Sequence, residues 1–307
     1  MWLTVSANAA AVLRVFAGMG LGLGAIVLLR GVIILGYAIA WARLLGGVAT
    51  VPFSACLLLR WIRESVDVLL PVASIGGELV GARLLTFWRV PVGTATASIL
   101  ADLLLQATAQ IAFALLGLAL LASVAGIGVR ALNAAAGVGL AALAIGGFYA
   151  AQRHGGLRRI DRLLAALAAR WAVARPASGL RLQEGSDAVW AGRGRLAQAL
   201  ALHFACFMIG AVEVWLVTQF TAHPAGFGGA VILESLTNAL RGFAFIVPAG
   251  LGVQEAGFVG LGYLLGLPPD AALAVSLAHR VPDVMLGVPG LLAWYRLELS
   301  RRLRAAR

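Results

Sequence analysis

Few residues of this 307-residue chain carry a charge, and none of its basic residues is a lysine. Charged residues make up 12% of the sequence, with 13 acidic residues against 24 basic ones, all of them arginine. Hydrophobic residues make up 61%, and the mean hydropathy is +0.94. No window of the sequence has the polar composition of a soluble domain, so the shortage of charge indicates an integral membrane protein.

Cysteine and histidine are also scarce. Cys56 and Cys206 both lie in apolar runs, and the four histidines lack the spacing of metal ligands. The sequence therefore predicts neither a disulfide framework nor a metal site. The glycine-rich stretches contain no nucleotide-binding motif, and no Ser/His/Asp or Cys/His arrangement indicates a catalytic centre. We expect no cofactor and no enzyme activity.

The arginines cluster between and after the apolar runs and give the chain a net charge of +11. This placement is typical of the positive-inside pattern of membrane proteins. We therefore expect the basic cytoplasmic face to contact anionic lipid headgroups, and we do not expect nucleic acid as a partner.

One short stretch occurs twice, at residues 70–78 and 247–255. In each copy a proline stands seven residues before a glutamate, another proline follows thirteen residues after it, and the copies are offset by 177 residues. This pattern indicates an internal duplication. Proline removes a backbone donor and glycine permits unusual dihedral angles, so each copy predicts a helix break. The residues of the two breaks are Pro71, Gly76, Gly77, Pro248, Gly250 and Gly252.

Apolar runs long enough to span a membrane alternate with shorter ones beside the breaks. The expected spans are 18–41, 91–124, 132–151, 196–220 and 269–294. The shorter pieces 48–70 and 78–90, and again 231–248 and 251–267, are interpreted as the limbs of two re-entrant helical hairpins.

The expected fold is an all-α polytopic membrane protein with an inverted repeat, in which each unit is a span, a re-entrant hairpin and a second span. Repeat one covers 18–124 and repeat two covers 196–296. Between them lie the span 132–151 and a basic amphipathic segment, 153–195, on the membrane surface. The arginines of this segment and of the tail predict a cytoplasmic C-terminus.

Charged side chains on the hairpins are the first candidate site. Arg60, Glu64 and Asp67 share one helix face, and Glu234, Asn238 and Arg241 repeat that arrangement in the second hairpin. One interpretation is a polar cleft for a lipid headgroup, with Arg60, Arg63 and Arg241 holding its phosphate. The alternative is that Glu64 pairs with Arg60 or Arg63, and Glu234 with Arg241, only to neutralise the hairpins.

Further candidates lie beside the breaks and on the following spans. Glu78 and Glu255 are expected to cap the helices that follow the breaks, or else to titrate as proton-coupling carboxylates; capping is the favoured role. Arg83 lies where the first hairpin leaves the membrane. Asp102 and Arg280 occupy neighbouring positions of the two repeats and could pair across them. Arg30 and Glu213 are interpreted as lone intramembrane charges that hold helices together.

Two motifs carry a resemblance to a known family: residues 61–71 with Gly76, Gly77, Glu78 and 83–85, and residues 247–256 with the later Arg280. They resemble the transmembrane region of lysylphosphatidylglycerol synthases, the flippase-like family, and are most similar to the branch associated with hopanoid biosynthesis. The resemblance implies lipid translocation by a polytopic domain. The soluble aminoacyl-transferase domain of the full synthases is not found, so lysyl transfer is not implied.

The leading hypothesis is therefore a flippase-like transporter in the bacterial inner (plasma) membrane that moves a hopanoid, polyisoprenoid or phospholipid between leaflets. A second hypothesis is a non-transporting membrane protein that docks a lipid-biosynthesis enzyme through the basic segment 153–195. A weaker third hypothesis is an intramembrane lipid-transferring enzyme.

Overall fold

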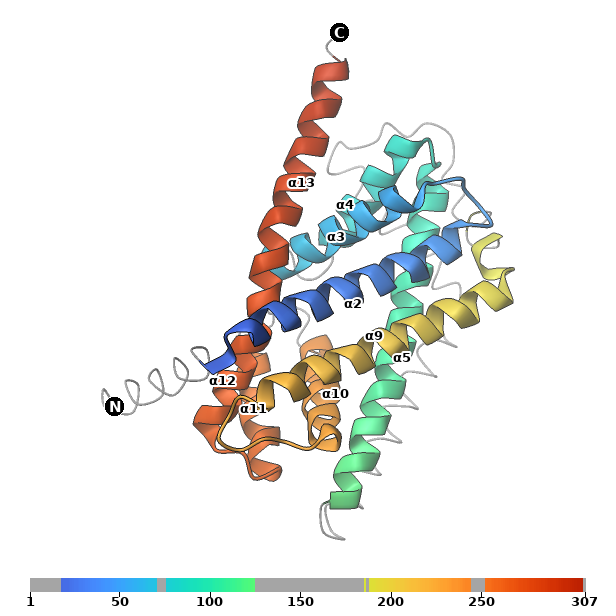
Figure 1. Cartoon of the computed structure of the whole chain (residues 1–307). Coiled ribbons are helices and arrows are strands. Elements are labelled where there is room, and N and C mark those ends of the chain that lie inside the picture. The colour runs from blue at the N-terminus through green and yellow to red at the C-terminus, as the bar shows by residue number, and fades with distance from the viewer. Residues whose placement is uncertain (1–17, 71–75, 125–184, 186–187, 244–251, 306–307) are drawn as a thin grey trace.

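The computed structural model describes residues 18–70, 76–124, 185, 188–243 and 252–305, and every regular element in these ranges is helical. The elements are α2 (Leu21–Leu45), α3 (Phe53–Leu69), α4 (Gly76–Leu85), the 3₁₀ helix η1 (Thr86–Trp88), α5 (Val92–Val124), α9 (Arg193–Thr218), α10 (Phe227–Phe243), α11 (Val253–Leu264), α12 (Pro269–His279) and α13 (Val281–Ala305). Figure 1 shows α5 and α13 extending towards opposite ends of the molecule. The prediction of an all-helical chain is confirmed for the described residues.

Four stretches of the described residues are long and apolar enough to cross a membrane: Leu21–Leu45, Val92–Val124, Arg193–Thr218 and Pro269–Arg301. They confirm the expected spans 18–41, 91–124 and 196–220 to within four residues, and the expected span 269–294, which extends further, to Arg301. The expected span 132–151, the basic segment up to residue 184, Pro71, Pro248 and Gly250 lie outside the described residues. The chain is a multi-pass membrane protein.

The last span is not one continuous helix, as the sequence had predicted. It divides at Arg280 into α12 and α13. Pro282 has no backbone N–H and cannot continue the helical hydrogen-bond ladder back to Ala278. The amide of Arg280 instead donates to the carbonyl of Leu277 at 3.1 Å, which tightens the last turn of α12.

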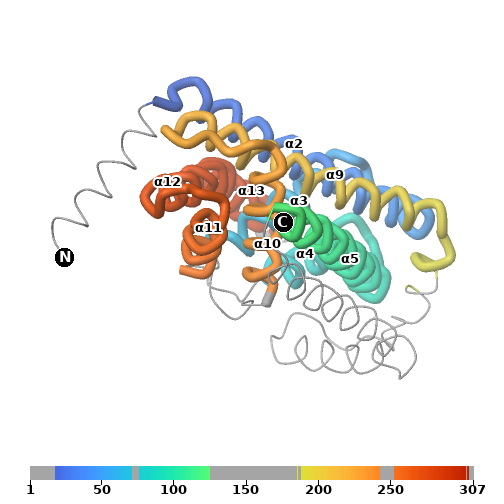
Figure 2. Tube along the Cα trace, turned by 90° about the horizontal axis from the view of Figure 1, so that it is seen from below, coloured from blue at the N-terminus to red at the C-terminus, as the bar shows by residue number. Residues whose placement is uncertain are grey.

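The long helices α2 and α9 lie side by side and antiparallel (Figures 1 and 2), and Figure 2 shows them along one edge of the molecule. Arg30 in the first half of α2 contacts Glu213 near the end of α9, and Arg43 near the end of α2 contacts Gln198 near the start of α9. A Cβ added at Gly36 would overlap the sulfur of Cys206. The glycine therefore permits the close approach of the two helices.

The same order of elements occurs twice, as a long helix, a 17-residue helix, a short helix and a long apolar stretch. The long stretch of each half packs on the 17-residue helix of the other half: α5 on α10, and α13 on α3. The indole Nε1 of Trp61 in α3 donates to the carbonyl of Leu286 in α13 at 2.8 Å. The amide of Gln110 in α5 donates to the carbonyl of Ser235 in α10 at 3.2 Å. The two halves therefore interlock.

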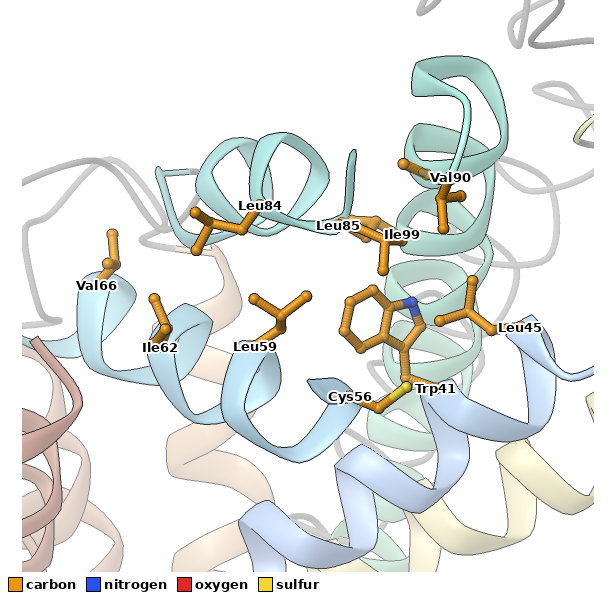
Figure 3. Packing of buried hydrophobic residues seen from close by; sticks show 11 residues of the cluster. Trp41, Leu45, Cys56, Leu59, Ile62, Val66, Leu84, Leu85, Val90 and Ile99 are labelled. Carbon is orange, nitrogen blue, oxygen red and sulfur yellow. The ribbon is translucent and has the colours of Figure 1, made fainter. Parts of the chain in front are cut away.

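The first hairpin is anchored by an apolar core. Figure 3 shows the ring of Trp41 from α2 among side chains of α3, α4 and α5. Its Nε1 donates to Ser98 Oγ at 3.2 Å, so the one polar atom of this buried ring is satisfied. The buried apolar members of the core are Trp41, Leu45, Cys56, Leu59, Ile62, Val66, Leu84, Leu85, Val90, Ala95 and Ile99.

The helix ends at the two breaks agree with the glycine positions. α4 begins at Gly76, and a Cβ added at Gly77 would overlap the carbonyl oxygen of Arg63 and the carboxylate of Asp67. α11 begins after Gly252, whose φ of +79° is readily adopted only by glycine. Gly77 therefore permits the close contact of α4 with the end of α3, and Gly252 permits the backbone conformation at the start of α11.

Candidate functional site

A cavity of about 430 Å³ lies where the two halves meet. Its lining comes from α2, α3, α4, α5, α9, α10, α12 and α13, so neither half forms it alone. Three arginines and five carboxylates line it: Arg30, Arg60, Arg241, Glu64, Asp67, Glu78, Glu234 and Asp283. Its other polar side chains are Tyr37, Gln106, Gln110, Asn238 and His279. Such a concentration of charge among apolar spans is costly unless the groups pair or contact water.

The charge network on the α3 side is organised by Asp102. This carboxylate is fully buried and accepts from Arg60 Nη1 at 3.0 Å and from Arg63 Nη2 at 3.2 Å. His203 Nε2 lies 3.0 Å from Asp102 Oδ1, an arrangement in which the imidazole donates. Three partners from α3 and α9 thus share one carboxylate of α5.

Both arginines of this network have further partners. Arg60 donates to Glu64 and to Gln106, each at 3.3 Å, and Arg63 donates to Glu78. The Arg60 guanidinium also lies 4.6 Å from the ring centroid of Tyr37. The pairing of Glu64 with Arg60, one of the two alternatives drawn from the sequence, is confirmed. These two guanidinium groups are already engaged with carboxylates before any ligand binds.

The amide that Glu78 is expected to cap belongs to residue 75, which is equivalent to Gly252 and lies outside the described residues, so the capping role of Glu78 stays a prediction. The amide of Gly77 donates to Asp67 Oδ1 at 2.8 Å, because the end of α3 lies against the start of α4. The carboxylate of Glu78 also pairs with Arg63. In the second half the prediction is confirmed, since the amide of Gly252 donates to Glu255 Oε2 at 2.8 Å.

The network on the α10 side is organised by Arg30. It donates to both oxygens of Glu213, at 2.9 and 3.2 Å, and its Nη1 lies 3.3 Å from Asp283. The prediction that Arg30 and Glu213 are lone charges is therefore wrong, whereas their role in holding helices together is confirmed. Their separation of 183 residues explains why no local pattern paired them.

Glu234 does not form the expected pair with Arg241. Its Oε1 accepts from Asn238 Nδ2 at 2.8 Å, and its Oε2 lies 3.5 Å from His279 Nε2. Arg241 lines the cavity and has no ion pair with any residue that the structure describes. It therefore differs from the other cavity arginines, Arg30 and Arg60, which are bound to carboxylates.

Several residues predicted from the sequence lie away from the cavity. Arg83 pairs with Glu298 at 2.8 Å and is 41% exposed. Glu255 pairs with Arg280 at 2.7 Å. The expected pair between Asp102 and Arg280 is wrong, because Asp102 lies with Arg60, Arg63 and His203. Arg63 and Asp102 lie behind the lining, whereas the two helix-face stripes, Arg60, Glu64, Asp67 and Glu234, Asn238, Arg241, both reach the cavity.

Three residues of the site were missed: Tyr37, His203 and His279. The offset of 177 residues could have pointed to one of them, because it places His279 at the position equivalent to Asp102. No group of His, Cys, Asp and Glu in the described ranges could hold a metal ion.

The cavity can hold a polar group of small-molecule size against carboxylates and one guanidinium, with apolar helices around it. A family model described as "Lysylphosphatidylglycerol synthase TM region" matches residues 1–290. No curated protein and no solved structure matches the chain.

Proposed function

The chain belongs to the family of the lysylphosphatidylglycerol synthase TM region, and on this premise we propose that it moves a phospholipid between the leaflets of the plasma membrane. The headgroup passes through the cavity between the two halves while the acyl chains remain in the bilayer. The observation that carries this proposal is a charged cavity, buried among spanning helices, in which Arg241 has no ion pair with a described residue.

The arrangement of α2 and α9 supports an inverted repeat. The antiparallel contacts centre near Ile33 of α2 and Ile209 of α9, and the 177-residue offset relates Val32 to Ile209. A two-fold axis that exchanges two antiparallel helices is perpendicular to both. If both helices span the bilayer, the axis lies in the membrane plane, so the two units have opposite topologies.

The lengths of the short helices support re-entrant hairpins. α4 has 10 residues and α11 has 12, which at 1.5 Å per residue gives about 15–18 Å, too short for a hydrocarbon core of about 30 Å. These lengths support hairpins that enter and leave on one side of the membrane. The arginines at the end of α13, among them Arg296 and Arg301, support a cytoplasmic C-terminus.

The charges of the cavity favour a headgroup with a phosphate and with hydroxyl or amine donors. The guanidinium of Arg241 is the available phosphate ligand, since Arg60 and Arg63 already bind Asp102. Glu64 and Asp67 line the same cavity and can accept hydrogen bonds from the donors of the headgroup.

A second gap, of about 10 Å³, lies between α2, α3 and α13, so a lateral opening for the acyl chains at this place requires these helices to move apart. It shares Arg30 and Glu64 with the cavity and adds the apolar surface of Ile34, Leu286 and Gly287. A headgroup in the cavity could therefore remain joined to chains that lie between these helices.

The test is lipid movement in liposomes that contain the purified protein and a fluorescent phosphatidylglycerol. We expect Arg241→Ala to lower the rate by about 10- to 100-fold, the equivalent of about 1.5–3 kcal/mol for one charged hydrogen bond. Arg43→Ala, at an exposed position outside the cavity, is the matched control and should keep the parent rate. An unchanged rate in Arg241→Ala would remove this residue from the site.

A parent protein that moves no lipid would overturn the transport proposal. It would favour the alternative in which the chain docks a lipid-biosynthesis enzyme through the basic segment 153–195. A pull-down that depends on the arginines of this segment would then support the docking role. The transport proposal itself includes no catalytic step and no cofactor.

A further inference from the structure

His279 lies at the centre of an unusual set of charges on the cavity wall. Its side chain is 2% exposed, and its Nε2 lies 3.1 Å from Arg30 Nη2. The same nitrogen lies 3.5 Å from Glu234 Oε2 and 3.7 Å from Glu213 Oε1. One imidazole nitrogen thus faces a guanidinium and two carboxylates at once.

These neighbours require different protonation states of His279. A guanidinium can only donate, so the contact with Arg30 is a hydrogen bond only when Nε2 carries no proton. A carboxylate can only accept, so the contact with Glu234 is a hydrogen bond only when a proton lies between the two groups. The two hydrogen-bond patterns differ by one proton.

The charges that face His279 come from every helix packed around it. They are Arg30 of α2, Glu213 of α9, Glu234 and Arg241 of α10, Asp283 of α13, and the pair of Arg280 with Glu255 of α11. Around Arg30 and His279 themselves, three carboxylates accompany one guanidinium. Among these carboxylates Glu234 lies nearest to His279 and has no ion pair with an arginine that the structure describes, so a proton taken up from water in the cavity can be shared between these two groups.

The equivalent place in the first half has no such ambiguity. Asp102 stands at the position related to His279 by the 177-residue offset and is held by two guanidinium groups. The neighbouring His203 Nε2 faces only a carboxylate, which fixes it as a donor. Of the two equivalent positions, Asp102 and His279, only His279 can therefore change its hydrogen-bond partner when it gains or loses a proton.

We propose that His279 and Glu234 form a proton-binding site, with one proton held between Nε2 and Oε2, and that its uptake and release are coupled to lipid movement. The coupling rests on the proposed transport function. A proton from cavity water adds to a lone pair of His279 Nε2 or Glu234 Oε2 and is then shared between these two atoms. The guanidinium of Arg30 can then no longer donate to Nε2 and keeps only its carboxylate partners, Glu213 and Asp283. No bond other than the N–H or O–H bond forms or breaks.

The position of His279 gives this exchange a mechanical consequence. His279 is the last residue of α12 and stands directly before the division at Arg280. Loss of its contact with Arg30 separates the end of α12 from α2, while Asp283 at the start of α13 keeps its contact with Arg30. The angle between α12 and α13 can therefore change with protonation.

The first experiment needs no lipid transport. Protein with ¹⁵N-labelled histidine is placed in lipid nanodiscs, and its imidazole resonances are recorded from about pH 5 to 8, the range in which imidazole titrates. We expect the resonance that is missing in His279→Gln to titrate in the parent protein. The pH at the midpoint of this titration should be lower in Glu234→Gln, a variant that keeps an acceptor for Asn238. The same shift identifies the His279 resonance if His279→Gln does not fold. A His279 resonance that stays constant over this range would overturn the proton site.

The second experiment measures lipid movement in the same liposomes as a function of pH. We expect the parent rate to change by up to about tenfold per pH unit, the limit for one proton, and the pH profile of His279→Gln to be flat. His223→Gln, in the exposed loop after α9, should keep the parent profile. Lipid movement that is independent of pH would overturn the coupling and leave the transport function standing. No lipid movement at all would overturn transport, and the resonances would still decide whether the proton site exists.

Discussion

Replacement of Asp102 by asparagine should destabilise the protein more than any other loss of one carboxylate from the α3 side of the cavity. Asp102 is fully buried and accepts from Arg60, Arg63 and His203 at 3.0–3.2 Å. An asparagine of the same shape removes the charge and turns one of the two acceptor atoms into a donor that faces other donors.

The magnitude follows from the burial of the partners. Removing one member of a buried ion pair costs about 3–5 kcal/mol, because the remaining charge stays buried without compensation. Arg60 and Arg63 are 3% and 1% exposed, so both remain out of water in Asp102→Asn. They keep Glu64 and Glu78, which prevents a larger loss.

Glu64→Gln is the matched comparison, since Glu64 contacts the same Arg60 but is 30% exposed. We expect it to cost less than about 1 kcal/mol, as for pairs open to solvent. The assay is equilibrium unfolding, in which SDS is titrated into protein in mild detergent micelles and helix content is followed by circular dichroism. Equal losses in the two variants, to within about 1 kcal/mol, would refute the claim that Asp102 organises the network.

Two further predictions concern the hairpins and the cavity. Gly77→Ala should destabilise the protein in the same assay by about 1–3 kcal/mol, because the added Cβ overlaps the Asp67 carboxylate. The control Gly260→Ala, whose Cβ would meet no atom within 4 Å, should be neutral or stabilising by up to about 1 kcal/mol. Equal effects of the two substitutions would contradict the close contact of Gly77 with the end of α3. A small methanethiosulfonate reagent should modify Cys206, which lines the cavity, faster than Cys56, which lies in the apolar core. Mass spectrometry of the folded protein measures the two rates, and modification of Cys206 that is no faster than that of Cys56 would contradict a cavity open to water.

The spans could be predicted from the sequence because their signal is local. A crossing helix needs about 20 consecutive apolar residues, and α2, α5 and α9 are such runs. The stripe of Arg60, Glu64 and Asp67 was also predictable, since residues four and three apart share a helix face. The glycines of the breaks and the capping role of Glu255 follow from the same short-range rules.

The pairing of charges could not be predicted because it depends on how the two halves interlock. His203 meets Asp102 across 101 residues, and Arg30 meets His279 across 249 residues. The amide of Gly77 meets Asp67 because the end of α3 lies against the start of α4, and no helical periodicity describes that contact. The division of the last span at Arg280 could have been predicted from Pro282, but the continuous apolar composition of the stretch favoured a single helix.

The most direct test of the account is to fill the cavity and measure lipid movement. Cys206 lies in the cavity lining at the crossing of α2 and α9, and the chain has one other cysteine, Cys56. We predict that a bulky thiol reagent lowers lipid movement by the parent protein to the rate of protein-free liposomes and leaves Cys206→Ser unaffected. Full lipid movement by protein whose Cys206 is completely modified would contradict passage of the headgroup through this cavity.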